Sequence, residues 1–186
     1  MPPGPDEISM SYDFDPHHPV PTIGGTLSSG QPIMEGGGYN QVEGERFFGS
    51  RPPYLPLARR LDILVFTSAP LSDDVEVTGP ISTRLWVSSN CPDTDFTMKL
   101  IDWYPPNEDY PKGFALNITD GILRCRYRNG FEKPEMMEPD GCYEIVIEPF
   151  PTSNLFKKNH RIRLDISSSN FPHFDVNPNT GHLREA

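Results

Sequence analysis

The stretch "HRIRLDISSS", residues 160–169, alternates between apolar and charged side chains. A period of two places successive side chains on opposite faces of a β-strand, so one face of this strand is apolar and the other is polar. The apolar face has Ile162, Leu164 and Ile166, and the polar face has Arg161, Arg163 and Asp165. We therefore predict an antiparallel strand that turns one face to a core and the other to water.

Five other segments have the composition and alternation of strands. They are "DILVFTS" (62–68), "ISTRLWVSS" (81–89), "DFTMKLIDWY" (95–104), "GILRCRYR" (121–128) and "CYEIVIEP" (142–149). In residues 95–104, Phe96, Met98 and Leu100 share one face. The opposite face, which has Lys99, is mixed in character, and this indicates that it is covered.

Residues 142–149 repeat the pattern of a strand with one wet face. The inward positions are Tyr143, Ile145 and Ile147, and the outward positions are Glu144 and Glu148. About seven such strands, separated by turns and without a long amphipathic helix, predict an all-β fold. Its simplest form is a jelly-roll β-sandwich.

The first third of the chain differs from the rest. The segments "DPHHPVPTIGG" (15–25) and "GSRPPYLP" (49–56) are rich in Pro and Gly and have no sustained period. With 186 residues, of which 35% are hydrophobic, the chain is long enough for one good core. We therefore predict an extended arm over residues 1–60 and a sandwich over residues 61–186. An arm of this kind must lie on a surface, which suggests a surface from another domain.

Charge and hydropathy exclude several classes of partner. The formal net charge is −10, whereas binding to nucleic-acid phosphates requires clustered Lys and Arg. No apolar stretch approaches the ~20 residues that span a bilayer. The N-terminal "MPPGPDEISM" has neither the basic nor the apolar region of a signal peptide. We expect no nucleic-acid partner, no membrane partner and a cytoplasmic location.

The three cysteines, Cys91, Cys125 and Cys142, show no C-x-x-C spacing and are odd in number. A disulfide framework or a zinc site is therefore not expected. We predict reduced thiols, with Cys125 in the core.

A catalytic serine is not evident. The nucleophile motif G-x-S-x-G of α/β-hydrolases does not occur in the chain. The nearest segment, "GGTLSSGQ" (24–31), lacks a glycine two residues before Ser28 or Ser29 and is followed by Pro32. We interpret it as a loop.

Two clusters combine histidine with aspartate: His17 and His18 beside Asp13 and Asp15, and His173 beside Asp175. The first could be part of a metal site or a triad, but adjacent residues of an extended chain point to opposite sides. The second could be a His–carboxylate pair, although the chain offers no nucleophile to complete it. We predict no catalytic residue, no cofactor and no metal site.

A row of arginines and a set of aromatic residues are candidate binding features. Arg124, Arg126 and Arg128 could hold a carboxylate or a partner surface, or form a solvated face paired with Glu144 and Glu148. Trp86, Trp103 and Tyr104 could stack a carbohydrate on the sandwich, or pack in a core or an interface. We favour the structural interpretation for both sets.

Several segments together resemble one family. They are "DPHHPVPTIGG", "DILVFTSAPLSDDVEVTGP" (62–80), "LWVSSNCPDTDFTMKLIDWYPP" (85–106), "LNITDGILRCRYR" (116–128) and "NHRIRLDISSSNFPHFDVNPNTG" (159–181). In composition and order they are similar to the C-terminal domain of the cocaine esterase and X-Pro dipeptidyl-peptidase group of serine hydrolases, the CocE/NonD family. The resemblance covers residues from about Tyr12 to Gly181.

The resemblance implies a parent protein with an α/β-hydrolase domain, a helical cap and a C-terminal jelly roll like that of galactose-binding domains. The Ser, Asp and His of such proteins precede the segment similar to "DPHHPVPTIGG", so no catalytic residue transfers to this chain. The expected role is to support the hydrolase domain of the same protein and to shape its cleft, and the parent reaction is hydrolysis of a peptide, ester or amide. Candidate cleft or interface residues are Trp86, Trp103, Phe171, His173 and Phe174. The alternatives are a stand-alone carbohydrate-binding module and a structural domain that forms a homodimer.

Two segments depart from the family pattern. The insert "NEDYPKGFA" (107–115) is longer than the usual turn, and the strand expected after "NPNTG" is absent because the chain stops at "HLREA" (182–186). A missing strand would bare a sheet edge, through which two copies could pair. In the segment before it, Asn170, Pro172, Asn177, Pro178 and Gly181 are expected to form a turn over the sandwich. Phe171 and Phe174 are expected to anchor that turn to the core.

Overall fold

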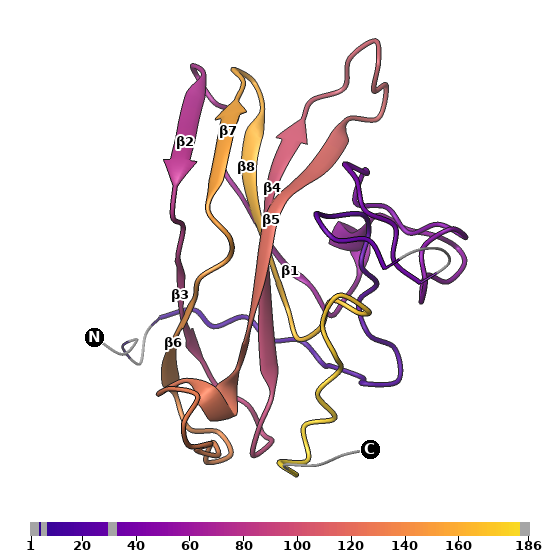
Figure 1. Cartoon of the computed structure of the whole chain (residues 1–186). Helices are drawn as coiled ribbons and strands as arrows, with labels where there is room; N and C mark the ends of the chain where they lie inside the picture. The colour runs from indigo at the N-terminus through magenta and orange to yellow at the C-terminus, as the bar shows by residue number, and fades with distance from the viewer. Residues whose placement is uncertain (1–3, 5–6, 30–32, 183–186) are drawn as a thin grey trace.

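The alternating segments form antiparallel strands in the computed structural model, which describes residues 4, 7–29 and 33–182 (Figure 1). The eight strands of these residues are β1 (Leu64–Thr67), β2 (Val75–Gly79), β3 (Thr83–Val87), β4 (Asp95–Tyr104), β5 (Phe114–Arg124), β6 (Tyr143–Ile147), β7 (Thr152–Phe156) and β8 (Arg161–Ser167). Two single-turn 3₁₀ helices, η1 (Leu57–Arg59) and η2 (Cys125–Tyr127), complete the regular structure. No helix within the described ranges has the length and apolar character to cross a membrane.

The strands form two layers. One is a four-stranded sheet in the order β1-β8-β4-β5, and the other consists of the pairs β2–β7 and β3–β6. In Figure 1 the two pairs follow each other along the left side. The arm, in indigo and purple, crosses from the N-terminus on the left, and most of it lies beyond the four-stranded sheet on the right. The all-β sandwich predicted from the sequence is confirmed.

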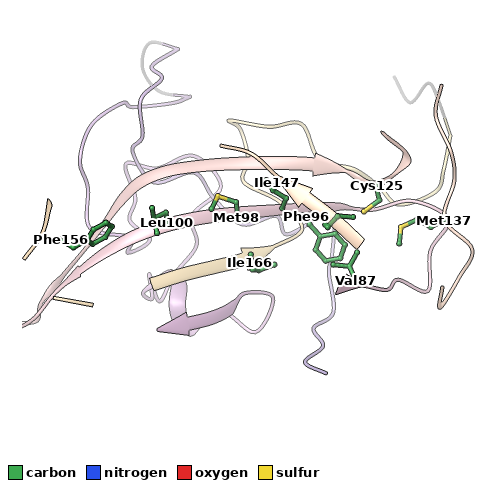
Figure 2. Close-up of a cluster of buried hydrophobic side chains, with 10 residues drawn as sticks. Val87, Phe96, Met98, Leu100, Cys125, Met137, Ile147, Phe156 and Ile166 are labelled. Carbon is green, nitrogen blue, oxygen red and sulfur yellow. The ribbon is translucent and has the colours of Figure 1, made fainter. Parts of the chain in front are cut away.

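The main core lies between these two layers (Figure 2). Phe96, Met98 and Leu100 of β4 contribute the face that their alternation predicts, and Ile145 and Ile147 of β6 do the same from the opposite layer. Burial of each large side chain stabilises the fold by about 1.5–3 kcal/mol. Cys125 is buried in this core, as predicted, and the three cysteines are free.

The other face of the four-stranded sheet lies beneath the arm. Thr97, Lys99 and Ile101 are at most 4% exposed, which confirms that the mixed face of β4 is covered. The arm has a small core of its own, made of Val20, Ile23, Phe47, Leu57 and Ile63, with Tyr39 and Val65 packed against it.

The polar face predicted for β8 is not in water. Arg163 and Asp165 are 6% and 4% exposed, so the predicted wet face is wrong for these two residues. They lie on the side of the sheet away from the main core, but the arm forms a third layer over them. The two buried side chains are paired with each other, since Arg163 Nε donates to Asp165 Oδ1 over 2.7 Å.

Three features of the strands were not predicted from the sequence and are known only from the structure. β2 and β7 were not among the predicted segments, and β5 begins at Phe114, within the segment interpreted as an insert. The alternation predicted for residues 121–128 stops at Arg124, because η2 follows directly. The division at residue 60 and the pairing of two copies through a bare edge stay predictions, and residues 183–186 lie outside the described part of the chain.

Candidate functional site

The segment that follows β8 is fixed to the arm by backbone hydrogen bonds. Phe171 N donates to Val20 O over 2.9 Å, and Thr22 N donates to Phe171 O over 2.7 Å, so that Pro21 and Phe171 form a parallel bridge. The Phe171 ring also contacts Phe48, with 5.7 Å between the ring centroids. Phe171 therefore anchors the turn to the arm. It was expected to anchor it to the main core, and it belongs to neither apolar cluster.

His173 and Phe174 follow Phe171 in the same turn. Their rings stack with centroids 4.2 Å apart. His173 Nδ1 lies 3.2 Å from Asp120 Oδ1 of β5, whereas Asp175 Oδ2 accepts from Arg124 Nη2 at 3.1 Å. The pair considered between His173 and Asp175 is therefore not formed, and the carboxylate partner of His173 comes from another strand.

Asp120 belongs to a row of charges that crosses the covered face of the sheet. Lys99 lies opposite Asp120 in the register of β4 and β5, and opposite Asp165 in the register of β4 and β8. From the arm, Gln41 Oε1 accepts a long hydrogen bond of 3.4 Å from Lys99 Nζ. Gln41 Nε2 donates to Ile23 O at 2.9 Å, so one buried amide links this row to the arm.

Burial and neighbouring charges shift the pKa values of Lys99 and Asp120. The pKa of the Lys99 ammonium is lowered, chiefly because burial disfavours its charged form. Burial alone would raise the pKa of Asp120, but the hydrogen bond from His173 and the charge of Lys99 together lower it below 3.8. The folded protein thus holds an ionised carboxylate between two cationic or hydrogen-bonding neighbours.

The predicted row of three arginines does not form a common face. Arg124 Nε donates to Asp95 Oδ1 at 2.9 Å, and Arg126 Nε donates to Asp93 Oδ2 at 2.7 Å with only 6% of the Arg126 side chain exposed. Arg128 donates from Nη1 to the carbonyl groups of Cys125 and Glu135. The expected pairing with Glu144 and Glu148 is wrong, because β5 ends at Arg124 and the buried Asp95 and Asp93 pair with Arg124 and Arg126. Glu144 pairs with Arg84 instead.

The turn over the end of the sandwich is built on these buried groups. Asn177 Nδ2 donates to both Asp93 and Asp95, and Asn177 Oδ1 accepts from Asn179 N over 2.9 Å. The predicted local hydrogen bonding of Asn177 is confirmed. Asn170 acts through its backbone carbonyl, which accepts from Phe174 N, while its buried side-chain amide has no hydrogen-bond partner among the described residues.

The other sequence candidates lie apart from this surface. His18 Nδ1 is 2.9 Å from Asp15 Oδ2, and both side chains are about half exposed. No group of three His, Cys, Asp or Glu in the described part of the chain could hold a metal ion. Ser28 lies in an exposed loop, where its hydroxyl donates to Met34 O.

The five candidate interface residues divide into two sets. Phe171, His173 and Phe174 lie together on the arm side of the molecule. Trp86 is in β3 opposite Glu144, and Trp103 is near the C-terminal end of β4 opposite Arg161. The structure does not bring the two tryptophans to the first set.

Sequence reasoning missed the contacts that Asp120, Lys99 and Gln41 make between the sheet and the arm. The mixed face of β4 was a signal for Lys99, because a lysine between covered apolar positions needs a partner. No comparable signal existed for Gln41, whose position in an aperiodic arm carries no information about its contacts.

Comparisons with known proteins identify a family for this chain. A family model described as the X-Pro dipeptidyl-peptidase C-terminal non-catalytic domain matches residues 6–186. The chain belongs to this family. Its predicted membership in the C-terminal domains of CocE/NonD-type hydrolases is thereby confirmed.

The X-Pro dipeptidyl-peptidase C-terminal domain has relatives among esterases and peptidases. The chain is 41% identical over 175 residues to cocaine esterase of Rhodococcus sp. (strain MB1 Bresler), a match that covers 94% of this chain and 27% of that protein. An α-amino acid ester hydrolase structure matches 98% of the chain and 29% of its own length, with 26% identity and a TM-score of 0.74. An aminopeptidase from a marine sediment archaeon, Thaumarchaeota archaeon, matches 67% of the chain and 21% of its own length, with 34% identity and a TM-score of 0.64.

The chain therefore spans between a fifth and a third of the length of these relatives. The comparisons favour a non-catalytic domain of a hydrolase over a stand-alone carbohydrate-binding module.

Proposed function

We propose that this domain supports an α/β-hydrolase domain of the same polypeptide and forms part of the wall of its substrate cleft. The contact surface in this proposal is the outer side of the arm together with residues 170–175. The lengths of the relatives support the proposal, since each has about 70% or more of its chain outside the matched region.

The observation that carries the proposal is the apolar character of the arm's outer side. Leu27, Ile33, Phe48 and Leu55 of the arm are between 44% and 51% exposed. Several exposed large apolar side chains within one segment favour a surface that another domain covers. Phe48 also contacts Phe171, so the exposed side of the arm is continuous with the turn.

The internal structure of the arm supports the same role. Its own apolar cluster and the hydrogen bonds of Gln41 fix it to the sheet, so that it presents a defined surface. A cleft wall must hold its position to about an ångström to orient a substrate. Phe171 and Phe174 are the aromatic groups that this wall would present to an acyl group.

The reaction assigned to the parent protein is hydrolysis of a peptide, ester or amide by acyl transfer to serine and then to water. The names of the relatives include an esterase, an ester hydrolase and an aminopeptidase, which all fit this class. The triad would be contributed by the hydrolase domain, and the 186-residue chain alone should not turn over an ester.

Replacement of Phe174 by Ala in the full-length protein tests the proposal. We expect a loss of at least tenfold in kcat/KM, about 1.4 kcal/mol, without a change in the melting temperature of the hydrolase domain. Phe150→Ala is the matched control, because Phe150 is 72% exposed and lies outside both the arm and the turn. Unchanged kinetics for Phe174→Ala would contradict a role in the cleft wall.

A further inference from the structure

A pocket of about 310 Å³ lies at the end of the sandwich where β4 ends and β8 begins. It is lined by Pro70, Trp103, Pro105, Pro106, Asn159 and Arg161. In Figure 1 the C-terminal end of β4 and the hairpin between β7 and β8 lie at the top, whereas β3 and β6 lie at the lower left. None of these lining residues belongs to the surface proposed for the hydrolase domain.

Backbone hydrogen bonds between distant segments hold the walls of this pocket together. Asn159 N donates to Leu71 O, and Leu71 N donates to His160 O, both over 2.9 Å. Ser68 O accepts from Arg161 Nη1 over 2.8 Å. The segment after β1 is therefore tied to the hairpin that precedes β8, and the pocket is a built feature of the sandwich end.

Arg161 is unusual among the arginines of this acidic chain. It has no carboxylate within ion-pair distance among the described residues, and Ser68 O is its one hydrogen-bond acceptor there. Arg51 and Arg59 also lack a carboxylate but are exposed, and Arg128 is bound by several carbonyl groups. Arg161 is thus a half-buried cation with most of its five donors unused.

Trp103 supplies an aromatic plane beside this cation. The guanidinium of Arg161 lies over the Trp103 ring, 5.4 Å from its centroid. Trp103 Nε1 has no hydrogen-bond partner among the described residues, so the indole offers a further donor. The three proline rings complete apolar walls, while Glu108 and Asp109 of the adjacent loop are exposed and do not line the pocket.

From these groups we infer that the pocket binds a small monocarboxylate with a flat aromatic body. The guanidinium of Arg161 matches the geometry and the charge of a carboxylate. The ring of the ligand would lie against Trp103 and the prolines, where aromatic surfaces stack well. A neutral sugar would leave the guanidinium without a counter-charge, and this distinguishes the site from a carbohydrate platform.

Fluorescence of Trp103 provides a direct test. The chain has two tryptophans, so the Trp86→Phe variant retains Trp103 as its single reporter. We expect saturable quenching by phenylacetate, with binding at least tenfold weaker for phenylacetamide, which lacks the charge, and for acetate, which lacks the ring. Equal binding of either analogue would overturn the inference, as would the absence of a saturable change up to about 10 mM phenylacetate.

An Arg161→Gln variant tests the role of the cation, and Arg84→Gln serves as its control. Arg84 is an exposed arginine of β3 that pairs with Glu144 away from the pocket. We expect at least a tenfold loss of phenylacetate affinity for Arg161→Gln and no change for Arg84→Gln. Unchanged affinity in a folded Arg161→Gln protein would overturn the inference. If that variant does not fold, the ligand comparison on Trp86→Phe decides the matter.

Discussion

Asn177 donates a hydrogen bond from Nδ2 to Asp93 Oδ2 over 2.7 Å, although the two residues are 84 positions apart in the sequence, and both are at most 1% exposed. The same amide nitrogen donates to Asp95 Oδ1 over 2.8 Å. One neutral side chain thus separates two buried carboxylates and fixes the turn of residues 170–181 to the start of β4.

Replacement of Asn177 by Ala should therefore destabilise the domain. Two hydrogen bonds to buried carboxylates are lost, and a loss of about 1–3 kcal/mol in the free energy of unfolding is expected. Urea unfolding followed by circular dichroism measures the change. Asn129→Ala is the control, because Asn129 donates to Glu135 on the exposed surface. A loss no larger than that of the control would show that the bridge does not stabilise the fold.

Replacement of Asn177 by Asp should cost more than Ala at neutral pH. A third carboxylate would lie beside two others, and burial already raises the pKa of Asp95. The folded variant then binds more protons than the unfolded chain, so its stability falls as pH rises through the raised pKa. Unfolding free energies at pH 7 and near pH 4 should show the difference between Asp and Ala shrinking on acidification. A constant difference would contradict the proximity of the three groups.

The buried pair of Arg126 and Asp93 should also stabilise the domain. Arg126→Met leaves the Asp93 carboxylate without its cation, and a loss of about 3–5 kcal/mol is expected. The double variant Arg126→Met with Asp93→Asn should recover part of this loss, because no uncompensated charge remains. Arg84→Gln, which breaks an exposed pair with Glu144, should change stability little. Additive effects in the double variant would refute the coupling.

Acid sensitivity should depend on Asp120. Its pKa is lower in the folded protein than the ordinary 3.8, so its contribution to stability is present above that value and is lost as pH falls through the folded pKa. Lys99→Met removes one of the charges that lower this pKa. We therefore expect the acid unfolding midpoint of Lys99→Met to move to higher pH.

Asp120→Asn is the matched variant for this prediction, because it removes the titrating group. In the Asp120→Asn background, Lys99→Met should leave the acid midpoint nearly unchanged. Circular dichroism between pH 7 and about pH 2 measures both midpoints. A shift of the same size in the two backgrounds would show that Lys99 acts on other groups.

Gly24 tests the docking of the arm. Its φ is +66°, and an added Cβ would lie 2.3 Å from Gly37 O and 2.8 Å from the Tyr39 ring. The backbone would have to move to relieve these close contacts. This movement would disturb the two backbone hydrogen bonds that Gly25 and Gly37 exchange beside it. Gly24→Ala should lower stability by about 1–3 kcal/mol. Gly44→Ala is the control, since its nearest contact would be an ordinary 3.7 Å; equal effects of the two changes would contradict this account of the arm.

The alternation of single strands was sufficient to predict the fold class. It placed Phe96, Met98, Ile145 and Ile147 in the core, because a period of two determines which face of a sheet a side chain occupies. The same period cannot reveal whether a further layer covers the opposite face. For this reason Arg163 and Asp165 were predicted to be wet, although the arm buries them.

Partners that are distant in sequence could not be predicted. The Arg124 and Arg126 side chains were expected to share a face. Because β5 ends at Arg124, they bind different aspartates, Asp95 and Asp93 respectively. His173 was compared with its neighbour Asp175, whereas its carboxylate partner is Asp120 of β5, 53 positions earlier in the sequence. The positions of the candidate cleft residues relative to a hydrolase domain stay predictions.

Strand β1 has a consequence for anyone who wishes to shorten this protein. Leu64 packs against the main core, while its neighbours Ile63 and Val65 pack against the arm's own cluster. Excision of the arm would therefore wet one side of β1 and expose Lys99, Asp120 and Asp165 to solvent at once. A trimmed protein that is meant to stay monodisperse should retain the residues from Tyr12 onward, because Tyr12 packs against the main core and its hydroxyl hydrogen-bonds to Ser168 Oγ. Proteolytic nicking within the arm should favour aggregation of the whole sandwich.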